Sequence, residues 1–264
     1  MSSHDALHGP RRPLSRARTA RRYGLLVVPA LLVAGLVTSG CGEVKGADNV
    51  NLIAGKKAFV AKCGSCHTLA HAETKGVVGP DLDKAFEASI EEGLKRSTIR
   101  GVVEEQIKIP NPEGAMPKDL VSGSTAKDVA AYVEKVAAKP GKDTGLLATA
   151  VAPAGSGKPA EEKNGKLSIP ASPTGQLAYA TNKATATAGP VTIEMPNMSG
   201  VDHNISLEAG ANESSGPGPV LGHSQIISKG TASFSVTLKP GTYTFFCEVP
   251  GHRQAGMFGH LTVK

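Results

Sequence analysis

The sequence lacks tryptophan, and aromatic residues make up only 4% of its 264 residues. Any core must therefore be built mainly from aliphatic side chains and alanine. The sequence also lacks an excess of one charge after residue 40: residues 41–264 contain 23 basic and 22 acidic residues. Most of the net charge of +6 comes from the N-terminal arginines, so we expect no nucleic acid partner.

The apolar run "GLLVVPALLVAGLV", residues 24–37, contains Pro29 and is shorter than the about 20 residues that span a membrane as a helix. With the arginines before it, the run is typical of a secretory signal peptide over residues 1–40. It ends in "TSGC", and small residues before Cys41 resemble a bacterial lipobox. That resemblance implies an acylated Cys41, a tether over residues 41–50, and a lipid anchor in the outer face of the bacterial cytoplasmic membrane. An ordinary signal peptide and an uncleaved anchor are the alternatives.

The segment 51–138 has a helical pattern. In "STAKDVAAYVEKV" the apolar residues from Val129 to Val136 recur at i, i+3, i+4 and i+7, which predicts one apolar helix face. Thr125 and Asp128 have the spacing of a capping box, which would start that helix.

The segment 167–264 has a period of two instead. In "ASFSVTL", Phe234, Val236 and Leu238 alternate with polar residues, and four further short runs separated by Pro and Gly turns read as strands. About a hundred residues of short strands predict a β-sandwich. Between the two segments, residues 139–166 are rich in Gly, Pro, Ala and Lys. We interpret them as a flexible linker with a typical end-to-end distance of roughly 30 Å.

The helical segment carries the motif "CGSCH", which is the attachment signature of heme c. The thiols of Cys63 and Cys66 would add to the porphyrin vinyl groups, and His67 would bind the iron from one side. No second Cys-x-x-Cys motif is present to complete a four-sulfur zinc site.

The second axial ligand of the iron should follow later in the chain. Met116 lies in "EGAMPKDL", between Gly114 and Pro117 and before the last helix. Packing in a core is the commonest use of methionine, but this position favours ligation of the iron. Thioether ligation raises the heme potential and closes the coordination shell, so such an iron would pass electrons rather than bind substrate.

These motifs resemble a class I cytochrome c across the whole helical segment, from "GKKAF" through the heme box, "GVVGPDL" and "AMP" to a tyrosine on the last helix. The resemblance implies an all-α domain. It also implies that the carbonyl of Pro80 accepts a hydrogen bond from the ring of His67 and so orients it. Gly55 and Phe59 would pack against Tyr132.

The strand-rich segment carries "CEVPGHRQAGM" near its end. Cys247, His252 and Met257 supply a thiolate, an imidazole and a thioether from one glycine-containing loop, and His203 in "VDHNISLEA" can supply a second imidazole. Two histidines, one cysteine and a weak axial methionine form the ligand set of type 1 copper. Zinc accepts Cys and His, but methionine is a poor zinc ligand.

This loop resembles that of the cupredoxins, the family of plastocyanin and azurin, and its spacing is most similar to that of auracyanin and rusticyanin. The resemblance implies an all-β Greek-key sandwich over residues 167–264, in which Asn204 links the two ligand loops. A dinuclear copper centre would need a second cysteine in the loop, where Pro250 and Gly251 stand instead.

Other potential ligands are expected to have other roles. We predict that His71 is an exposed polar residue rather than a heme ligand. We expect none of His223, His260, Met195 and Met198 to bind copper. The four cysteines of an exported protein would usually suggest disulfides, but lipid, heme and copper account for all four here.

The sequence therefore predicts an electron carrier and not an enzyme. It would relay single electrons through heme c and type 1 copper between redox protein partners, namely a respiratory donor and a terminal oxidase or reductase. An alternative is an electron-entry subunit of an oxidoreductase, such as a nitrogen-oxide reductase.

Overall fold

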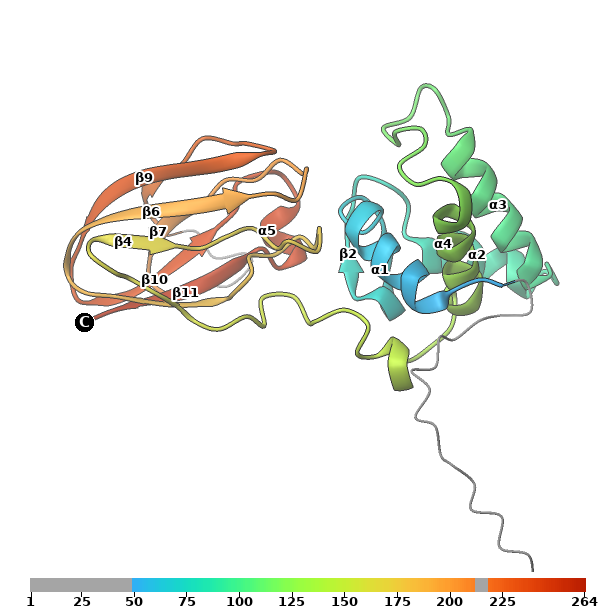
Figure 1. Ribbon diagram of the computed structural model, residues 1–264, viewed down its shortest axis with the longest axis horizontal. Helices are drawn as coiled ribbons and strands as arrows, with labels where there is room; N and C mark the ends of the chain where they lie inside the picture. The colour runs from blue at the N-terminus through green and yellow to red at the C-terminus, as the bar shows by residue number, and fades with distance from the viewer. Residues whose placement is uncertain (1–48, 212–217) are drawn as a thin grey trace, which may run out of the picture. The chain divides into compact units, whose positions relative to one another are not determined.

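A computed structural model describes residues 49–211 and 218–264. Helices dominate the first part of the described chain and strands the second (Figure 1). We call residues 49–151 the helical domain and residues 155–264 the β domain. The predicted order of an all-α domain followed by an all-β domain is confirmed. The expectations for the signal peptide (1–40), for Cys41 and for nearly all of the tether (41–50) lie outside the described residues.

The helical domain is built from four α-helices with short strands and 3-10 helices between and after them. Its elements are α1 (Leu52–Lys62), β1 (Thr68–Leu69), η1 (Ala70–Ala72), β2 (Thr74–Lys75), α2 (Leu82–Glu91), α3 (Arg96–Lys108), α4 (Gly123–Val136) and η2 (Gly145–Leu147).

The start of α1 is fixed by side-chain caps. Asn51 precedes α1, and its Oδ1 accepts a hydrogen bond from the backbone N–H of Ala54 at 3.0 Å. The backbone N–H of Asn51 donates to Oδ1 of Asp128 at 2.7 Å, which ties α1 to α4. The predicted capping box at Thr125 is wrong, because α4 begins two residues earlier, at Gly123, and the Asp128 carboxylate binds another helix.

The crossing of α1 and α4 forms the centre of this domain. A Cβ atom on Gly55 would clash with the backbone carbonyl group of Asp128 in α4 and lie 3.0 Å from Cβ of Tyr132, so only glycine allows the two helices to approach this closely. The rings of Phe59 and Tyr132 are buried with centroids 6.3 Å apart. The predicted packing of these three residues is confirmed.

The first part of the predicted linker belongs to the helical domain. The side chain of Asp143 is only 4% exposed, and its carboxylate accepts hydrogen bonds from the Tyr132 hydroxyl at 2.8 Å and from Nζ of Lys56 at 2.9 Å. Nδ1 of His71 lies 2.9 Å from the same carboxylate. His71 is therefore buried against Asp143, and the prediction of an exposed side chain is wrong.

The packing continues beyond Asp143. The carbonyl of Leu147 accepts a hydrogen bond from Nζ of Lys56 at 2.9 Å, and the Leu147 side chain joins the apolar core. Val151 packs against the same core. A flexible coil does not describe these residues, because they bury apolar surface and satisfy a buried ammonium group.

The β domain contains two sheets. The six-stranded sheet has the order β3-β5-β11-β10-β7-β8, and the three-stranded sheet has the order β4-β6-β9. The strands are β3 (Ala160–Glu161), β4 (Lys166–Ser168), β5 (Lys183–Ala186), β6 (Gly189–Asn197), β7 (Ser206–Ala209), β8 (Val220–His223), β9 (Gly230–Leu238), β10 (Gly241–Phe246) and β11 (Phe258–Val263), with one short helix, α5 (His252–Ala255), between β10 and β11.

One apolar core joins the two sheets. Side chains alternate along β6 and β9, so that every second residue faces the core. Phe234, Val236 and Leu238 share the inward face of β9, as predicted. Tyr179 and Phe245 meet edge to face in this core with ring centroids 5.3 Å apart.

The end of the predicted linker belongs to the β domain. The N–H of Gly157 donates to the carbonyl of Ala180 at 2.9 Å, and the carbonyl of Gly155 accepts from the N–H of Asn182 at 3.0 Å. β3 then pairs in parallel with β5. Only residues 152–154 remain between Val151, which packs in the helical core, and Gly155, whose backbone is paired within the β domain. Within this short stretch, the carbonyl of Ala152 accepts a hydrogen bond from Nε2 of Gln176 at 3.3 Å.

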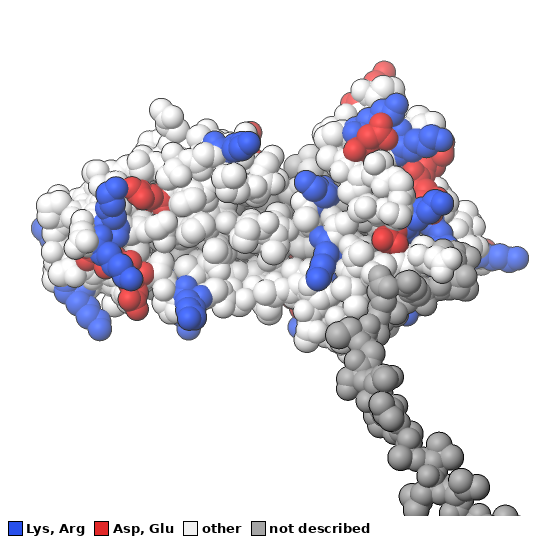
Figure 2. Space-filling view, in the orientation of Figure 1, with Lys and Arg blue, Asp and Glu red and all other residues white. Residues whose placement is uncertain are grey.

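Two further observations concern the described surface. Within residues 49–211 and 218–264, no helix combines the length and the apolar character needed to cross a membrane. On the face shown in Figure 2, blue and red side chains are interspersed within each domain, in keeping with the nearly equal numbers of basic and acidic residues.

The Asp143 cluster generates a first prediction. Replacing Asp143 with Ala should lower the unfolding free energy of the helical domain by about 3–5 kcal/mol, because the Lys56 ammonium stays buried without its carboxylate. Chemical denaturation followed at the heme absorption band measures the loss. The matched control is Lys142→Ala in the neighbouring exposed pair with Glu73, which should change little.

The same cluster sets a pH dependence. Burial favours a higher pKa for the Asp143 carboxyl, but the hydrogen bonds from Lys56, His71 and Tyr132 outweigh burial and hold the pKa below its ordinary value of 3.8. The stabilisation is therefore present above pH 3.8 and is lost as the pH falls through the native pKa. A difference between the parent and Asp143→Ala that stayed constant down to the acid transition would contradict this assignment.

Candidate metal centres

The helical domain encloses a mainly apolar cavity of about 550 Å³. The thiols of Cys63 and Cys66 and the ring of His67 line it, and so does Met116. Apolar side chains from four helices supply most of the remaining wall, namely Phe59, Leu82, Phe86, Val102, Val103, Ile107 and Val129. The structure thus brings together all four side chains predicted to hold the heme, around a space with the shape and chemistry for a flat apolar ring.

The orientation of His67 is set by the loop that follows the heme box. Nδ1 of His67 lies 2.9 Å from the carbonyl oxygen of Pro80, in position to donate a hydrogen bond to it. This bond fixes the tautomer and leaves Nε2 free to bind iron. The interaction expected from the family resemblance is therefore present in the geometry.

Gly79 was not recognised from the sequence as part of this arrangement. A Cβ atom there would lie 2.5 Å from Cε1 and 2.9 Å from Nε2 of His67. The backbone of Gly79 therefore lies against the imidazole ring, and its N–H donates to the carbonyl of Cys66 at 2.8 Å. The glycine before Pro80 was the available signal, because close backbone approach is a common reason for glycine.

The second centre depends on a tightly folded loop between β10 and β11. Cys247 directly follows β10, His252 begins α5, and Met257 directly precedes β11. Gly251 and Gly256 flank α5 with φ of 84° and 112°, values that other residues rarely adopt. These two glycines therefore allow the tight turns at both ends of α5.

Backbone hydrogen bonds hold the ligand-bearing residues of this loop together. The N–H of Cys247 donates to the carbonyl of Met257 at 3.1 Å, and the N–H of Met257 donates to the carbonyl of His252 at 2.9 Å. His203 comes from a separate segment before β7 and forms a two-way backbone bridge with Ile227.

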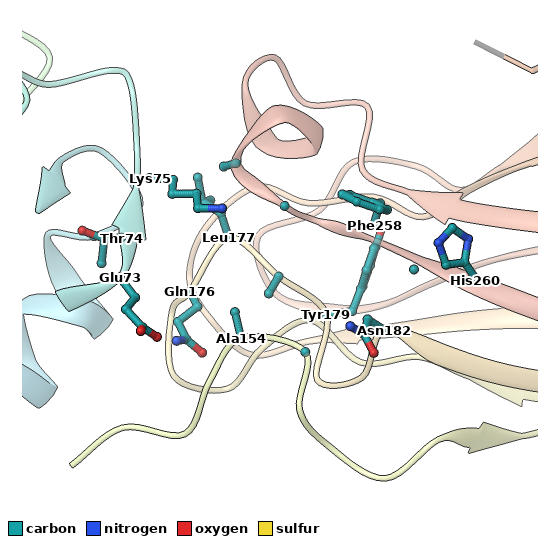
Figure 3. A pocket seen from close by; sticks show the side chains of 16 residues that line it. Glu73, Thr74, Lys75, Ala154, Gln176, Leu177, Tyr179, Asn182, Phe258 and His260 are labelled. Atoms are coloured by element: carbon teal, nitrogen blue, oxygen red, sulfur yellow. The ribbon is translucent and has the colours of Figure 1, made fainter. Parts of the chain in front are cut away.

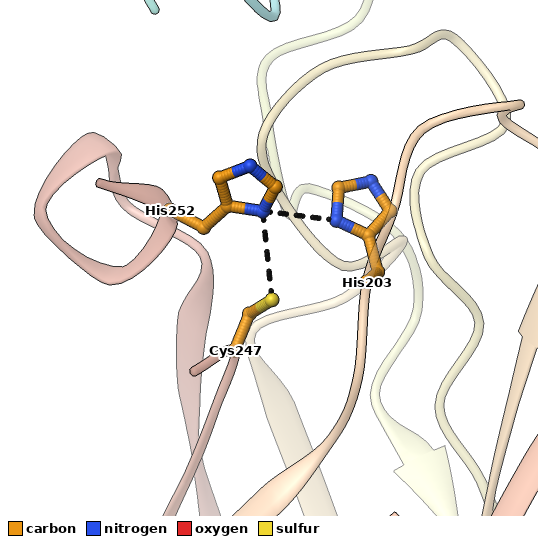
Figure 4. Close-up of side chains that lie close together, drawn as sticks. All are labelled: His203, Cys247 and His252. Atoms are coloured by element: carbon orange, nitrogen blue, oxygen red, sulfur yellow. Dashed lines mark hydrogen bonds between the residues drawn. The ribbon is translucent and has the colours of Figure 1, made fainter. Parts of the chain in front are cut away.

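Three donor atoms converge in the interior of the β domain (Figure 4). Nδ1 of His252 lies 3.1 Å from Nδ1 of His203 and 3.5 Å from Sγ of Cys247, and all three ligand atoms lie within 4.8 Å of one another. His203 and Met257 are fully buried, and His252 is the most exposed of the four predicted ligands at 9%. The donor set fits a copper ion with a weak axial thioether.

The protonation of the two imidazoles suits metal binding. Burial, with repulsion from His252, lowers the pKa of His203 to about 4, so its imidazole is neutral at neutral pH. Burial also lowers the pKa of His252. Neutral imidazole is the form that binds metals.

Asn204 links the two ligand segments, as the family resemblance implied. Its Oδ1 accepts the backbone N–H of Glu248 at 2.8 Å, and its Nδ2 donates to the Glu248 carboxylate at 2.7 Å. Since Asn204 follows His203 and Glu248 follows Cys247, this one side chain fixes the spacing between two ligands. Sequence reasoning missed Glu248.

The spare histidines and methionines lie elsewhere. His223 is on β8, with Nδ1 3.2 Å from the Glu248 carboxylate. His260 is on β11 beside Phe258, with ring centroids 6.1 Å apart (Figure 3). Met195 is in the core, and Met198 is 70% exposed. Neither of the two histidines belongs to the set of converging donor atoms found in the described residues.

Fold and sites together define a protein with two redox-metal domains, one for heme and one for copper. Residues 52–137 match the sequence model of cytochrome c. Residues 168–264 match that of the copper-binding proteins of the plastocyanin/azurin family. The chain therefore joins a cytochrome c domain to a cupredoxin domain, and it is an electron-transfer protein whose cofactors are heme c and type 1 copper.

Individual proteins are similar to parts of this chain. Rusticyanin of Acidithiobacillus ferrooxidans is 29% identical over 160 residues, which cover 59% of this chain and 93% of rusticyanin. The predicted likeness to rusticyanin is thereby confirmed. The solved structure of auracyanin B is 26% identical, covering 42% of this chain and 96% of auracyanin B, with a TM-score of 0.33. Reduced auracyanin from the photosynthetic bacterium Roseiflexus castenholzii is 22% identical, covering 42% of this chain and 99% of its own, with a TM-score of 0.30.

Gly79 provides a test of the heme geometry. The added methyl group of Gly79→Ala should displace the His67 ring and weaken its hydrogen bond to Pro80. Overpacking of this kind should lower the unfolding free energy by about 1–3 kcal/mol. We expect a shifted heme midpoint potential and an altered visible spectrum of the heme-loaded protein. In the control, Gly101→Ala, the added methyl meets no atom within 4 Å in α3 and should stabilise the helix by up to about 1 kcal/mol. Identical heme spectra and potentials in both variants would show that Gly79 does not position the ligand.

Proposed function

We propose that this chain relays single electrons between its own heme and its own copper ion at the outer face of the bacterial cytoplasmic membrane. Cys63 and Cys66 hold the heme covalently, with His67 and Met116 as axial ligands of the iron. His203, Cys247, His252 and Met257 hold the copper. The relay receives electrons from a respiratory donor and delivers them to a terminal oxidase or reductase, and Cys41 carries the lipid that anchors it.

The observation that carries this proposal is the shortness of the connection between the two domains. Val151 packs in the helical core, and Gly155 is hydrogen-bonded within the β domain. The Cα atoms of these two residues are separated by four peptide steps, so they are at most about 14 Å apart even in a fully extended chain. Pro153 stiffens this joint further by fixing its own φ.

Because the joint has only three residues, each domain should collide with the other domain of the same chain more often than with domains of other chains. A flexible linker of the length expected from the sequence would hold its ends roughly 30 Å apart on average. The shorter joint raises the effective concentration of one domain around the other. Electron exchange within one chain then competes favourably with exchange between chains.

Neither site requires an open coordination position for this role. The heme supplies a one-electron iron couple, and the copper ion supplies another. His67 is oriented by Pro80, and His203 and Cys247 are linked through Asn204 and Glu248. The protein residues thus hold the ligands in place so that charge changes without ligand exchange, as an electron carrier requires.

Carbon monoxide distinguishes a carrier from an oxidoreductase subunit with an open heme. The reduced parent protein should show an unchanged heme spectrum under carbon monoxide, because Met116 occupies the sixth position. Met116→Ala should bind carbon monoxide, whereas the control Met198→Ala, which alters an exposed methionine, should behave as the parent does. Binding of carbon monoxide by the parent would favour the oxidoreductase alternative.

Lengthening the joint tests the relay itself. Inserting twenty Gly and Ser residues between Pro153 and Ala154 should slow electron transfer from heme to copper by about twentyfold, because effective concentration falls roughly as the −3/2 power of tether length. The measurement is flash reduction of the heme followed by loss of the blue copper absorption. In the parent, the rate should not depend on protein concentration.

The matched control carries the same insertion at Gly93, in the loop between α2 and α3, where the glycine has open space around it. It should retain the parental rate. A rate that rises in proportion to protein concentration, or one that the joint insertion leaves unchanged, would contradict a relay within one chain.

A further inference from the structure

An ion pair between a buried carboxylate and the guanidinium group of a partly buried arginine, whose side chain is 13% exposed, lies directly beside the copper-binding loop. Glu208 is on β7 and is 1% exposed. Its carboxylate accepts Nη2 of Arg253 at 2.6 Å and Nη1 at 3.1 Å, so the two side chains meet through both oxygens and both nitrogens. The N–H of Gly218 donates to the same carboxylate at 3.2 Å.

The position of Arg253 connects this pair to the ligands. Arg253 directly follows His252 on α5, and its guanidinium carbon lies 4.2 Å from the centre of the Phe246 ring. Phe246 is the residue directly before Cys247. The Arg253 guanidinium group therefore contacts the residue that precedes Cys247 in the chain, and Arg253 itself follows His252.

The backbone hydrogen bonds at the two ends of α5 stay within the loop between β10 and β11. α5 has only four residues, and the glycines at both of its ends are in left-handed conformations. These hydrogen bonds are short-range and run from Ala255 to Gly251, from Gly256 to Arg253, from His252 to Val249 and from Met257 to His252. They shape the turn without fixing its direction relative to β7 and β10.

A buried ion pair is an expensive way to obtain stability alone. Removing both charges from water costs several kcal/mol per ion, and apolar residues of similar volume often stabilise a fold equally well. The two-pronged contact between guanidinium and carboxylate instead imposes a defined direction. The chemistry of this pair is therefore suited to orientation.

We propose that Glu208 and Arg253 are positioning residues for the copper centre. Together with Phe246 they hold α5 against β7 and β10, so that His252 keeps its place relative to Cys247. This inference rests on the copper ligand set proposed above, and it adds a contact that the ligand motif itself does not contain.

Two conservative variants of the copper-loaded full chain test the proposal. Arg253→Lys keeps the charge but loses the two-pronged contact, and Glu208→Gln keeps the shape but loses the charge. In both we expect a changed intensity ratio of the visible charge-transfer bands, a shifted copper potential, and loss of copper to a chelator at least about tenfold faster than in the parent. The double variant should be no worse than the more severe single one, because the residues act as a unit.

The matched control is Glu194→Gln, which breaks the exposed pair with Lys166 on the other sheet of the same domain. It should leave the copper spectrum, potential and release rate unchanged. If one variant fails to fold, the spectrum and release rate of the other decide the outcome.

Copper-loaded Arg253→Lys and Glu208→Gln proteins with parental spectra, potentials and release rates would overturn the positioning role, even if their unfolding free energies fell. Failure of the parent chain itself to take up copper would instead refute the ligand set of the proposed function.

Discussion

The copper half of this protein depends on keeping one thiol sulfur and two imidazole nitrogens within 4.8 Å of one another inside a β-sandwich. Left without an ion, these polar donors would be costly to bury. The surrounding structure fixes the backbone or the segment of each donor residue separately. Ile227 holds the backbone of His203, Met257 holds that of Cys247, and Asn204 connects the two segments. Each ligand-bearing segment is thus held by neighbours within the β domain.

The heme half meets a different requirement, which is to hold a large flat ring in a small helical domain with few aromatic residues. The crossing of α1 and α4 and the backbone contact of Gly79 with His67 shape the cavity. The segment that closes this domain contributes the buried carboxylate of Asp143 and then continues into the joint. The residues that follow α4 therefore both stabilise the heme domain and shorten the connection to the β domain.

The two fold classes, the heme box, the copper-binding loop and the alternating strand at Phe234 were all predictable from the sequence, because each is a local pattern with a fixed spacing. The structured ends of the connecting segment were not. Asp143 lies in a stretch rich in Gly, Pro and Lys, and its partner Lys56 is 87 residues earlier. For the same reason, no local signal showed that His71 is buried or that Arg253 meets Glu208, 45 residues away. Long-range pairing of charges is set by the fold and leaves no periodicity to detect.

The claim that one chain holds two one-electron centres is tested most directly by a potentiometric titration of the mature protein, with iron and copper determined on the same sample. We expect one iron and one copper per chain, with two separate one-electron transitions, one at the heme bands and one at the blue copper band. A colourless protein, a single transition, or zinc in place of copper would contradict the account.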